Sequence, residues 1–260
     1  MDFDLQKKAE LVTDLLKKEG VVNIPKMRVG GALDVSISMR PHIDDGRPGN
    51  RLQKTVNQLM GPAIKLDDNG EIDMFKFDDY CEYVGTCSPA TYSNYVQKNG
   101  IRVRGGTAYA PIVKAVLDFY FKQGAKVVVE PAKKGLFGFG SKPAVINTLP
   151  DSIDTTPVLF MIITDGEVSP ADRRETEKLL REAIDKPIYF HFVAVGGGKG
   201  GGGPVGFPTI HYLADALPNV GEVYLPDFGM SDEAVYEQLI CDELIVFLKK
   251  FSNNSLASAG

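Results

Sequence analysis

Three short oxygen-bearing side chains gather at the end of one apolar segment. Asp34, Ser36 and Ser38 occupy alternate positions in residues 28–39, which read Arg-Val-Gly-Gly-Ala-Leu-Asp-Val-Ser-Ile-Ser-Met. This pattern predicts a buried strand whose carboxyl end meets a loop. Asp supplies an anionic oxygen and Ser supplies neutral ones, and a hard divalent cation such as Mg²⁺ prefers oxygen ligands. Asp, Ser and Gly are also ordinary turn residues, so this stretch alone leaves both interpretations open.

Two later segments place the same kind of side chain beside a predicted element. Thr107 follows two glycines, and Pro111 fits the first turn of the amphipathic helix that comes next. Residues 157–163 form a continuous apolar run that leads directly into Thr164 and Asp165. Such a run predicts a central strand buried on both faces. Hydroxyl and carboxylate oxygens are therefore expected in three separate loops.

Predicted strands and helices alternate along most of the chain, which favours a doubly wound α/β sheet with helices on both faces. In such sheets the ligand site lies beyond the carboxyl ends of the central strands, where Asp34 and Asp165 are expected. Residues 40–50 predict a loop. The expected strands are residues 27–35, 72–77, 81–84, 127–129, 157–163, 188–195 and 221–225. The expected helices include residues 2–19, 51–66, 111–123, 208–217 and 231–250, and a further helix is expected to begin at residues 169–170.

Composition narrows the class of protein. A formal net charge of −5 over 260 residues argues against a nucleic-acid surface, which needs a basic face. No apolar run reaches the roughly 18 residues of a membrane span, and residues 1–8 lack the order of a signal peptide. Cys81, Cys87 and Cys241 fit no common zinc spacing and are expected to be reduced thiols. These features predict a cytoplasmic protein.

The three loops together match a known motif. Asp34-x-Ser36-x-Ser38, then Thr107 after two glycines, then Asp165 between Thr and Gly resemble the metal-ion-dependent adhesion site of von Willebrand factor A domains. The resemblance covers about residues 20–250. Residues 105–111, 160–166 and 187–193 are similar to the TerF-like branch, which is associated with tellurium resistance. Ile37 is a departure, because many relatives have Gly there; it is expected to alter packing near the loop.

The resemblance carries several implications. It implies a mostly parallel six-stranded sheet with one antiparallel edge strand, in a von Willebrand factor A domain at residues 21–251. The amphipathic spacing at the start of the chain adds an extra helix, so residues 1–20 are expected to pack on the outside of this domain. Residues 252–260 are expected to form a disordered tail. The resemblance also implies Mg²⁺, with Mn²⁺ or Ca²⁺ as alternatives, held directly by Ser36, Ser38 and Thr107. Asp34 and Asp165 would act through bound waters.

Such a shell leaves one coordination position for an Asp or Glu carboxylate of a partner protein. The expected function is therefore non-enzymatic, metal-dependent protein binding in a tellurium-resistance or stress-response complex. No nucleic acid is expected as a partner, and peripheral association with a membrane is compatible with this setting. The loops at 133–142 and 196–206 are not assigned a role; the second lacks the Gly-Lys-Ser/Thr ending of a phosphate-binding loop.

An enzyme is the alternative. A carboxylate after the first strand, a second carboxylate and Mg²⁺ also resemble phosphohydrolases with an aspartate nucleophile, here Asp34. Those enzymes need an Asp two residues later as general acid, and that position is Ser36. Glu167 is interpreted as a helix-start carboxylate or an additional ligand. Three histidines are expected to be structural or surface residues: His42, His191 and His211.

Overall fold

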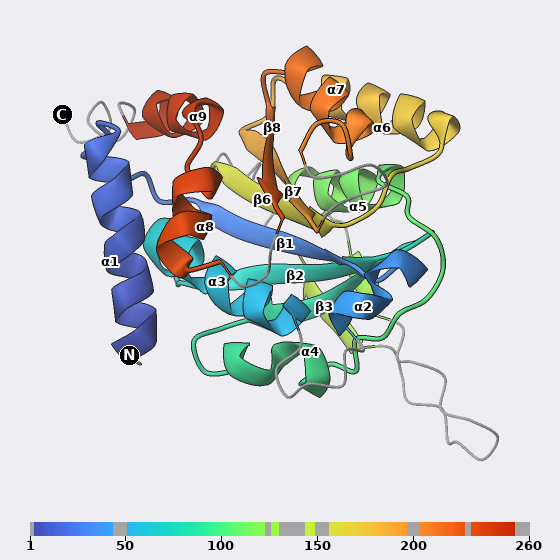
Figure 1. The fold of residues 1–260 in the computed structure, drawn as a ribbon, viewed down its shortest axis with the longest axis horizontal. Coiled ribbons are helices and arrows are strands. Elements are labelled where there is room, and N and C mark those ends of the chain that lie inside the picture. The colour runs from blue at the N-terminus through green and yellow to red at the C-terminus, as the bar shows by residue number, and fades with distance from the viewer. Residues whose placement is uncertain are drawn as a thin grey trace.

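The computed structural model describes residues 3–43, 51–122, 126–129, 144–148, 156–196, 203–226 and 230–252. Residues 253–260 of the predicted tail, the loop at 133–142 and residues 197–202 of the loop at 196–206 lie outside these residues. Ser252, predicted to begin the tail, is instead the last residue of a helix. A sheet crosses the centre of the molecule, and helices lie on both of its faces (Figure 1).

The central sheet has the order β3-β2-β1-β6-β7-β8. All neighbours pair in parallel except β2 and β3, which form an antiparallel edge. The predicted six-stranded sheet with one antiparallel edge strand is therefore confirmed. The strands are β1 (Arg28–Asp34), β2 (Ile72–Phe77), β3 (Cys81–Cys87), β6 (Val158–Thr164), β7 (Ile188–Val195) and β8 (Val220–Leu225), and a separate antiparallel pair consists of β4 (Lys126–Val129) and β5 (Ala144–Thr148).

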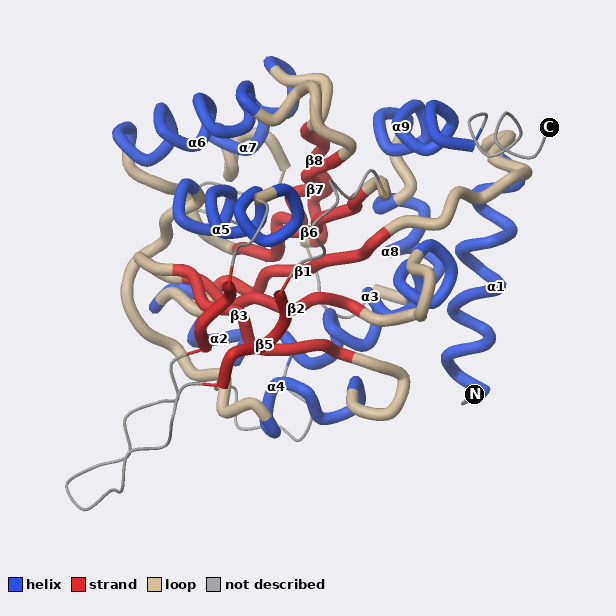
Figure 2. The backbone as a smooth tube through the Cα atoms, turned by 180° about the vertical axis from the view of Figure 1, so that it is seen from behind, coloured by secondary structure: helices blue, strands red, loops and turns tan. Residues whose placement is uncertain are grey.

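Alternate residues of the apolar strands face two separate cores. In β6, Phe160 and Ile162 join one core, whereas Met161 and Ile163 join the other. A fully apolar strand is needed here because both faces are covered. One core includes residues of α5 (Ala110–Phe121), α6 (Pro170–Glu182) and α7 (Pro208–Ala216). The other includes residues of α1 (Phe3–Lys18), α3 (Arg51–Leu66), α8 (Asp232–Leu239) and α9 (Asp242–Ser252). These two groups of helices lie on opposite faces of the sheet (Figures 1 and 2).

The helix at the start of the chain packs on α3 and α8. Its buried stripe includes Leu5, Val12 and Leu16. Lys8 is also buried, and its Nζ lies 2.5 Å from Oδ2 of Asp232 at the start of α8. Removing a charge from water is costly unless it is paired, so this contact fixes the register of α1 against α8.

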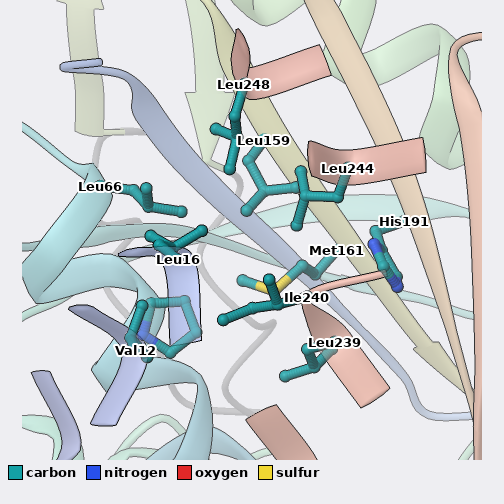
Figure 3. A pocket seen from close by; sticks show the side chains of 11 residues that line it. Val12, Leu16, Leu66, Leu159, Met161, His191, Leu239, Ile240, Leu244 and Leu248 are labelled. Carbon is teal, nitrogen blue, oxygen red and sulfur yellow. The ribbon is translucent and has the colours of Figure 1, made fainter. Parts of the chain in front are cut away.

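A small apolar cavity of about 10 Å³ lies between α1, α3, α9 and the sheet (Figure 3). Leu159, Met161 and Leu244 line it together with His191, whose Nε2 has no hydrogen-bond partner in the described structure. Burial lowers the pKa of His191 to about 4. His191 is thus a neutral, structural histidine, as the sequence interpretation proposed.

Two predictions about local structure are wrong. Residues 231–250 form two helices, because Ile240 leaves the helical conformation with φ −90° and ψ 64°. The break lets α8 bond α3 through the Tyr236 hydroxyl, 2.8 Å from the Gln58 carbonyl, while α9 takes a different direction (Figure 1). The expected loop at 40–50 begins instead as a short helix, α2 (Arg40–Ile43), preceded by a 3-10 turn, η1 (Ile37–Met39).

Three smaller features complete the fold. The edge strand β3 extends to Cys87, beyond the predicted end at residue 84, and pairs with β2 along its length. Residues 88–100 contain two short helical segments, η2 (Tyr92–Asn94) and α4 (Tyr95–Lys98). Among the helices that the structure describes, none is long and apolar enough to cross a membrane.

Candidate metal centre

The three predicted loops meet at one edge of the sheet. β1 and β6 are parallel neighbours, with Leu33 opposite Ile163. Asp34 is the last residue of β1 and Asp165 directly follows β6, so both lie at adjacent carboxyl ends. In the sheet, β1 lies between β2 and β6, and the strands that follow in the chain extend the sheet first on the β2 side and then on the β6 side. The strand order therefore reverses at β1, and the carboxyl ends of β1 and β6 form the switch point of the sheet. The loop before α5 closes the group, because the Ile37 N–H donates to the Gly105 carbonyl at 3.2 Å.

Asp34 is the buried centre of the group. It is 0% exposed, and both of its carboxylate oxygens accept hydrogen bonds: Oδ1 from the Ser36 N–H at 2.7 Å, and Oδ2 from the Thr164 hydroxyl at 2.6 Å. Burial raises the pKa of Asp34 to about 6, against these hydrogen bonds, and the nearby Asp165 charge adds to the rise. A bound cation would act in the opposite direction and favour the carboxylate.

The serine hydroxyls connect Asp165 to the first loop. Oγ of Ser36 lies 2.9 Å from Oγ of Ser38, and the Ser38 hydroxyl donates to Oδ1 of Asp165 at 2.7 Å. Burial raises the pKa of Asp165, and the hydrogen bond from Ser38 opposes this. Asp165 is therefore linked through the Ser38 hydroxyl to Ser36, whose backbone N–H binds Asp34.

Thr107 reaches the same place from the second loop. A β-carbon at Gly166 would lie 2.8 Å from Oγ1 of Thr107 and 3.5 Å from Oγ of Ser38. Both hydroxyls are thus close to the backbone that follows Asp165, and only a glycine leaves room for the Thr107 hydroxyl. The structure brings the five sequence-predicted residues together: Asp34, Ser36, Ser38, Thr107 and Asp165.

The remaining candidates occupy other positions. Both carboxylate oxygens of Glu167 accept from the Thr209 N–H, Oε1 at 3.2 Å and Oε2 at 3.3 Å. Glu167 is therefore a helix-start carboxylate, but it lies at the start of α7 and not of α6, the helix that follows it in the chain. His211 lies away from the group, and its Nδ1 is 2.9 Å from Oε1 of Glu222. That hydrogen bond raises the pKa of His211.

Sequence reasoning missed His42 and Thr164. Nε2 of His42 is 3.6 Å from Oδ2 of Asp165, although the sequence suggested only a structural or surface histidine. Thr164 was noted only as the residue before Asp165, but its side chain points to Asp34. The role of Thr164 could have been inferred from its place at the end of a strand. A polar side chain there lies on the same face of the sheet as the residue opposite it in the parallel neighbour, which is Asp34 when the paired register is continued by one residue.

The donor set fits a hard divalent cation. Two carboxylates and three hydroxyls present only oxygen, which suits Mg²⁺, Mn²⁺ or Ca²⁺ better than a soft metal. Within the described ranges, no three His, Cys, Asp or Glu side chains form a metal-binding group. The candidate centre differs from such groups because it has only two carboxylates and depends on hydroxyls for the rest.

This strand order, with oxygen donors on three loops at the switch point, defines a von Willebrand factor A fold. A model of the family "vWA found in TerF C terminus" matches residues 26–131, about two fifths of this chain. An uncharacterized protein of Bacillus subtilis (strain 168), YcbR, is 26% identical over 250 residues, which are 92% of this chain and 84% of that protein.

One solved structure supports this fold. Proximal thread matrix protein 1 from the mussel byssus superposes with a TM-score of 0.50 at 14% identity, covering 85% of this chain and 46% of that one. A second structure of that protein, described as having a zinc-occupied MIDAS motif, has a TM-score of 0.46 at 13% identity, covering 89% and 50%. The chain spans about half the length of these structures.

Proposed function

We propose that this domain binds a partner protein through a divalent metal ion at the candidate metal centre. One observation carries the proposal: the fully buried Asp34 carboxylate lies with a second carboxylate and three hydroxyls at the switch point of the sheet. Buried charges in proteins are generally paired or bound to metal. The match of residues 26–131 to a von Willebrand factor A family model supports the coarser statement that the domain is a protein-interaction module.

Each of the five residues has a proposed role. Ser36, Ser38 and Thr107 would hold Mg²⁺ directly, with Mn²⁺ or Ca²⁺ as alternatives. Both oxygens of Asp34 already accept protein hydrogen bonds, which supports an indirect role through water. Asp165 would act in the same way. The metal would supply a positive charge that neutral hydroxyls leave only partly compensated.

The open position of such an ion is suited to an Asp or Glu carboxylate of the partner. Ile37 lies between the two serines, and 59% of its surface is exposed. It would add an apolar contact next to the ion. The physiological setting that we propose is a cytoplasmic tellurium-resistance or stress-response complex, and the identity of the partner is the object of the experiment below.

Phosphohydrolysis by Asp34 has no comparable support. A nucleophilic carboxylate needs an oxygen open to the phosphorus, but Asp34 is 0% exposed and both of its oxygens accept hydrogen bonds. Position 36 supplies a serine in place of a general acid. Metal-dependent turnover in a phosphatase and ATPase screen, lost in Asp34→Asn, would nevertheless replace the binding proposal.

Calorimetric titration of metal-stripped protein with Mg²⁺, Mn²⁺ and Ca²⁺ tests the metal. Binding heat is expected in the wild type, and loss of it in Ser38→Ala and Asp165→Asn. The partner is sought by affinity capture with and without chelator, comparing the wild type with Asp165→Asn. A domain that gives no heat and no thermal shift with any of the three ions contradicts the proposal.

A further inference from the structure

Helix α5, which follows Thr107, receives its N-terminal cap from another helix. Its own N-cap residue, Tyr109, makes no side-chain cap hydrogen bond. The Asp172 carboxylate of α6 fills this role: Oδ2 accepts from the Tyr109 N–H at 2.8 Å, and Oδ1 accepts from the Ala110 N–H at 3.2 Å. Free N–H groups at a helix start need acceptors, and a carboxylate there is also favoured by the helix dipole.

Asp172 is itself held in place. Its N–H donates to Oγ of Ser169 at 3.1 Å, and the Thr176 hydroxyl donates to its Oδ2 at 3.3 Å. In a capping box the third residue of the helix turns back to its own cap residue. Here that third residue turns instead to α5, so its carboxylate joins two helices.

Tyr109 makes a second connection between the same two loops. Its side chain is fully buried, and its hydroxyl donates to the Gly166 carbonyl at 2.5 Å. Tyr109 is two residues after Thr107, and Gly166 directly follows Asp165. The loop of Thr107 and the loop of Asp165 are therefore joined through both Asp172 and Tyr109.

We propose that Asp172 is a positioning residue for the metal centre. It fixes the loop of Thr107 against the loop of Asp165, so the Thr107 hydroxyl is in place before an ion binds. This inference rests on the proposed metal-dependent function. Outer residues that orient a metal's ligands often affect metal affinity although they never touch the ion.

Helix capping alone makes a different prediction. If Asp172 only stabilised α5, its loss would lower the melting temperature and leave the affinity of the folded protein for metal unchanged. Asp172→Asn separates the two roles, because the amide keeps one acceptor oxygen but presents an NH₂ group to the second backbone N–H. The variant retains the shape of the side chain, and circular dichroism establishes that it is folded.

The test is titration of metal-stripped protein with Mn²⁺, in which electron paramagnetic resonance measures the free ion. We expect the dissociation constant of Asp172→Asn to rise about tenfold, the low end for residues that orient metal ligands. Asp118→Asn is the matched control, because it makes the same chemical change on the exposed face of α5, where Asp118 pairs with Lys114. Its dissociation constant should equal that of the wild type.

A double-mutant cycle with Thr107→Ala identifies the route of the effect. If Asp172 acts by placing the Thr107 hydroxyl, then adding Asp172→Asn to Thr107→Ala changes the Mn²⁺ affinity less than twofold. A full tenfold change in that background would mean that the Asp172 charge acts at a distance, and would overturn the inference.

Each remaining outcome has one meaning. If Asp172→Asn does not fold, Tyr109→Phe replaces it, because it deletes only the hydroxyl that binds Gly166, and weaker Mn²⁺ binding is expected again. If the folded variant binds Mn²⁺ with wild-type affinity, the positioning role is contradicted but the proposed metal-dependent function is not. Absence of Mn²⁺ binding in the wild type contradicts the proposed function as well.

Discussion

The hydroxyl of Thr164 donates a 2.6 Å hydrogen bond to Oδ2 of Asp34, joining the carboxyl ends of β6 and β1. Both residues are 0% exposed, so water cannot replace this bond. The hydroxyl partly offsets the effect of burial on the Asp34 pKa, which would otherwise be raised further. Thr164 thus helps to keep a carboxylate charged in the interior.

Thr164→Val tests this relationship with little change in shape. It leaves Oδ2 of Asp34 buried without its donor, so we expect the free energy of unfolding to fall by about 1–3 kcal/mol. The pKa of Asp34 should rise above its present value of about 6. Urea unfolding at pH 7.5 without metal gives the first quantity. Thr13→Val is the control, because within the described part of the chain the Thr13 hydroxyl donates to the carbonyl of Ala9 in its own helix, α1. Equal losses in the two variants would refute the prediction.

Gly166→Ala should disturb the second loop. The added methyl group would lie 2.8 Å from Oγ1 of Thr107, closer than a normal contact, so the hydroxyl or the loop must shift. We expect a loss of about 1–3 kcal/mol in stability, typical of overpacking, and weaker Mg²⁺ binding. In a Thr107→Ala background the same change should cost less stability, because the clashing atom is absent. Equal cost in both backgrounds, measured by urea unfolding, would count against this explanation.

Ile37→Ser separates metal binding from partner binding. The side chain is 59% exposed and is not a metal donor, so the Mg²⁺ dissociation constant measured by calorimetry should change less than about twofold. Metal-dependent capture of the partner should weaken, because a desolvated apolar contact is lost. Val246→Ser on α9, where the valine is 70% exposed, is the control and should leave capture unchanged. Unaltered capture by Ile37→Ser would remove this residue from the proposed interface.

His191 should make stability fall in acid. Its pKa is near 6.5 when unfolded and about 4 in the folded domain, because burial disfavours the charged ring. Above pH 6.5 the ring is neutral in both states and costs nothing. As the pH falls toward 4, only the unfolded state gains the proton, so the folded state loses stability, by about 3 kcal/mol in total.

His191→Leu is expected to remove this part of the pH dependence, because leucine has no group that titrates. Leucine suits the position because leucines already line the cavity beside the ring (Figure 3). The measurement is urea unfolding of both proteins from pH 7.5 to pH 4. Parallel stability curves over that range would show that His191 does not contribute the acid sensitivity.

The amino-acid sequence determined the strands and the candidate site residues largely by itself. Apolar runs that end in Asp34 and Asp165 indicate strands whose carboxyl ends carry oxygen donors, and Thr107 before a proline-started helix is an equally local signal. The α/β class follows from the alternation of elements, and the motif spread over three loops indicates the resemblance to von Willebrand factor A domains. Each strand end and each piece of the motif lies within a few adjacent residues, and their order along the chain is enough to read the whole.

Tertiary structure decided how those residues are held. Asp172 caps α5 from a helix 62 residues further along the chain, and Thr164 binds Asp34 across 130 residues. The break at Ile240 likewise depends on where α8 meets α3. Such contacts depend on which elements become neighbours in the fold, and the local pattern of polar and apolar residues does not encode that choice. A hydrogen-bonded carboxylate in the interior, unlike a strand, is specified by partners that only folding brings within reach.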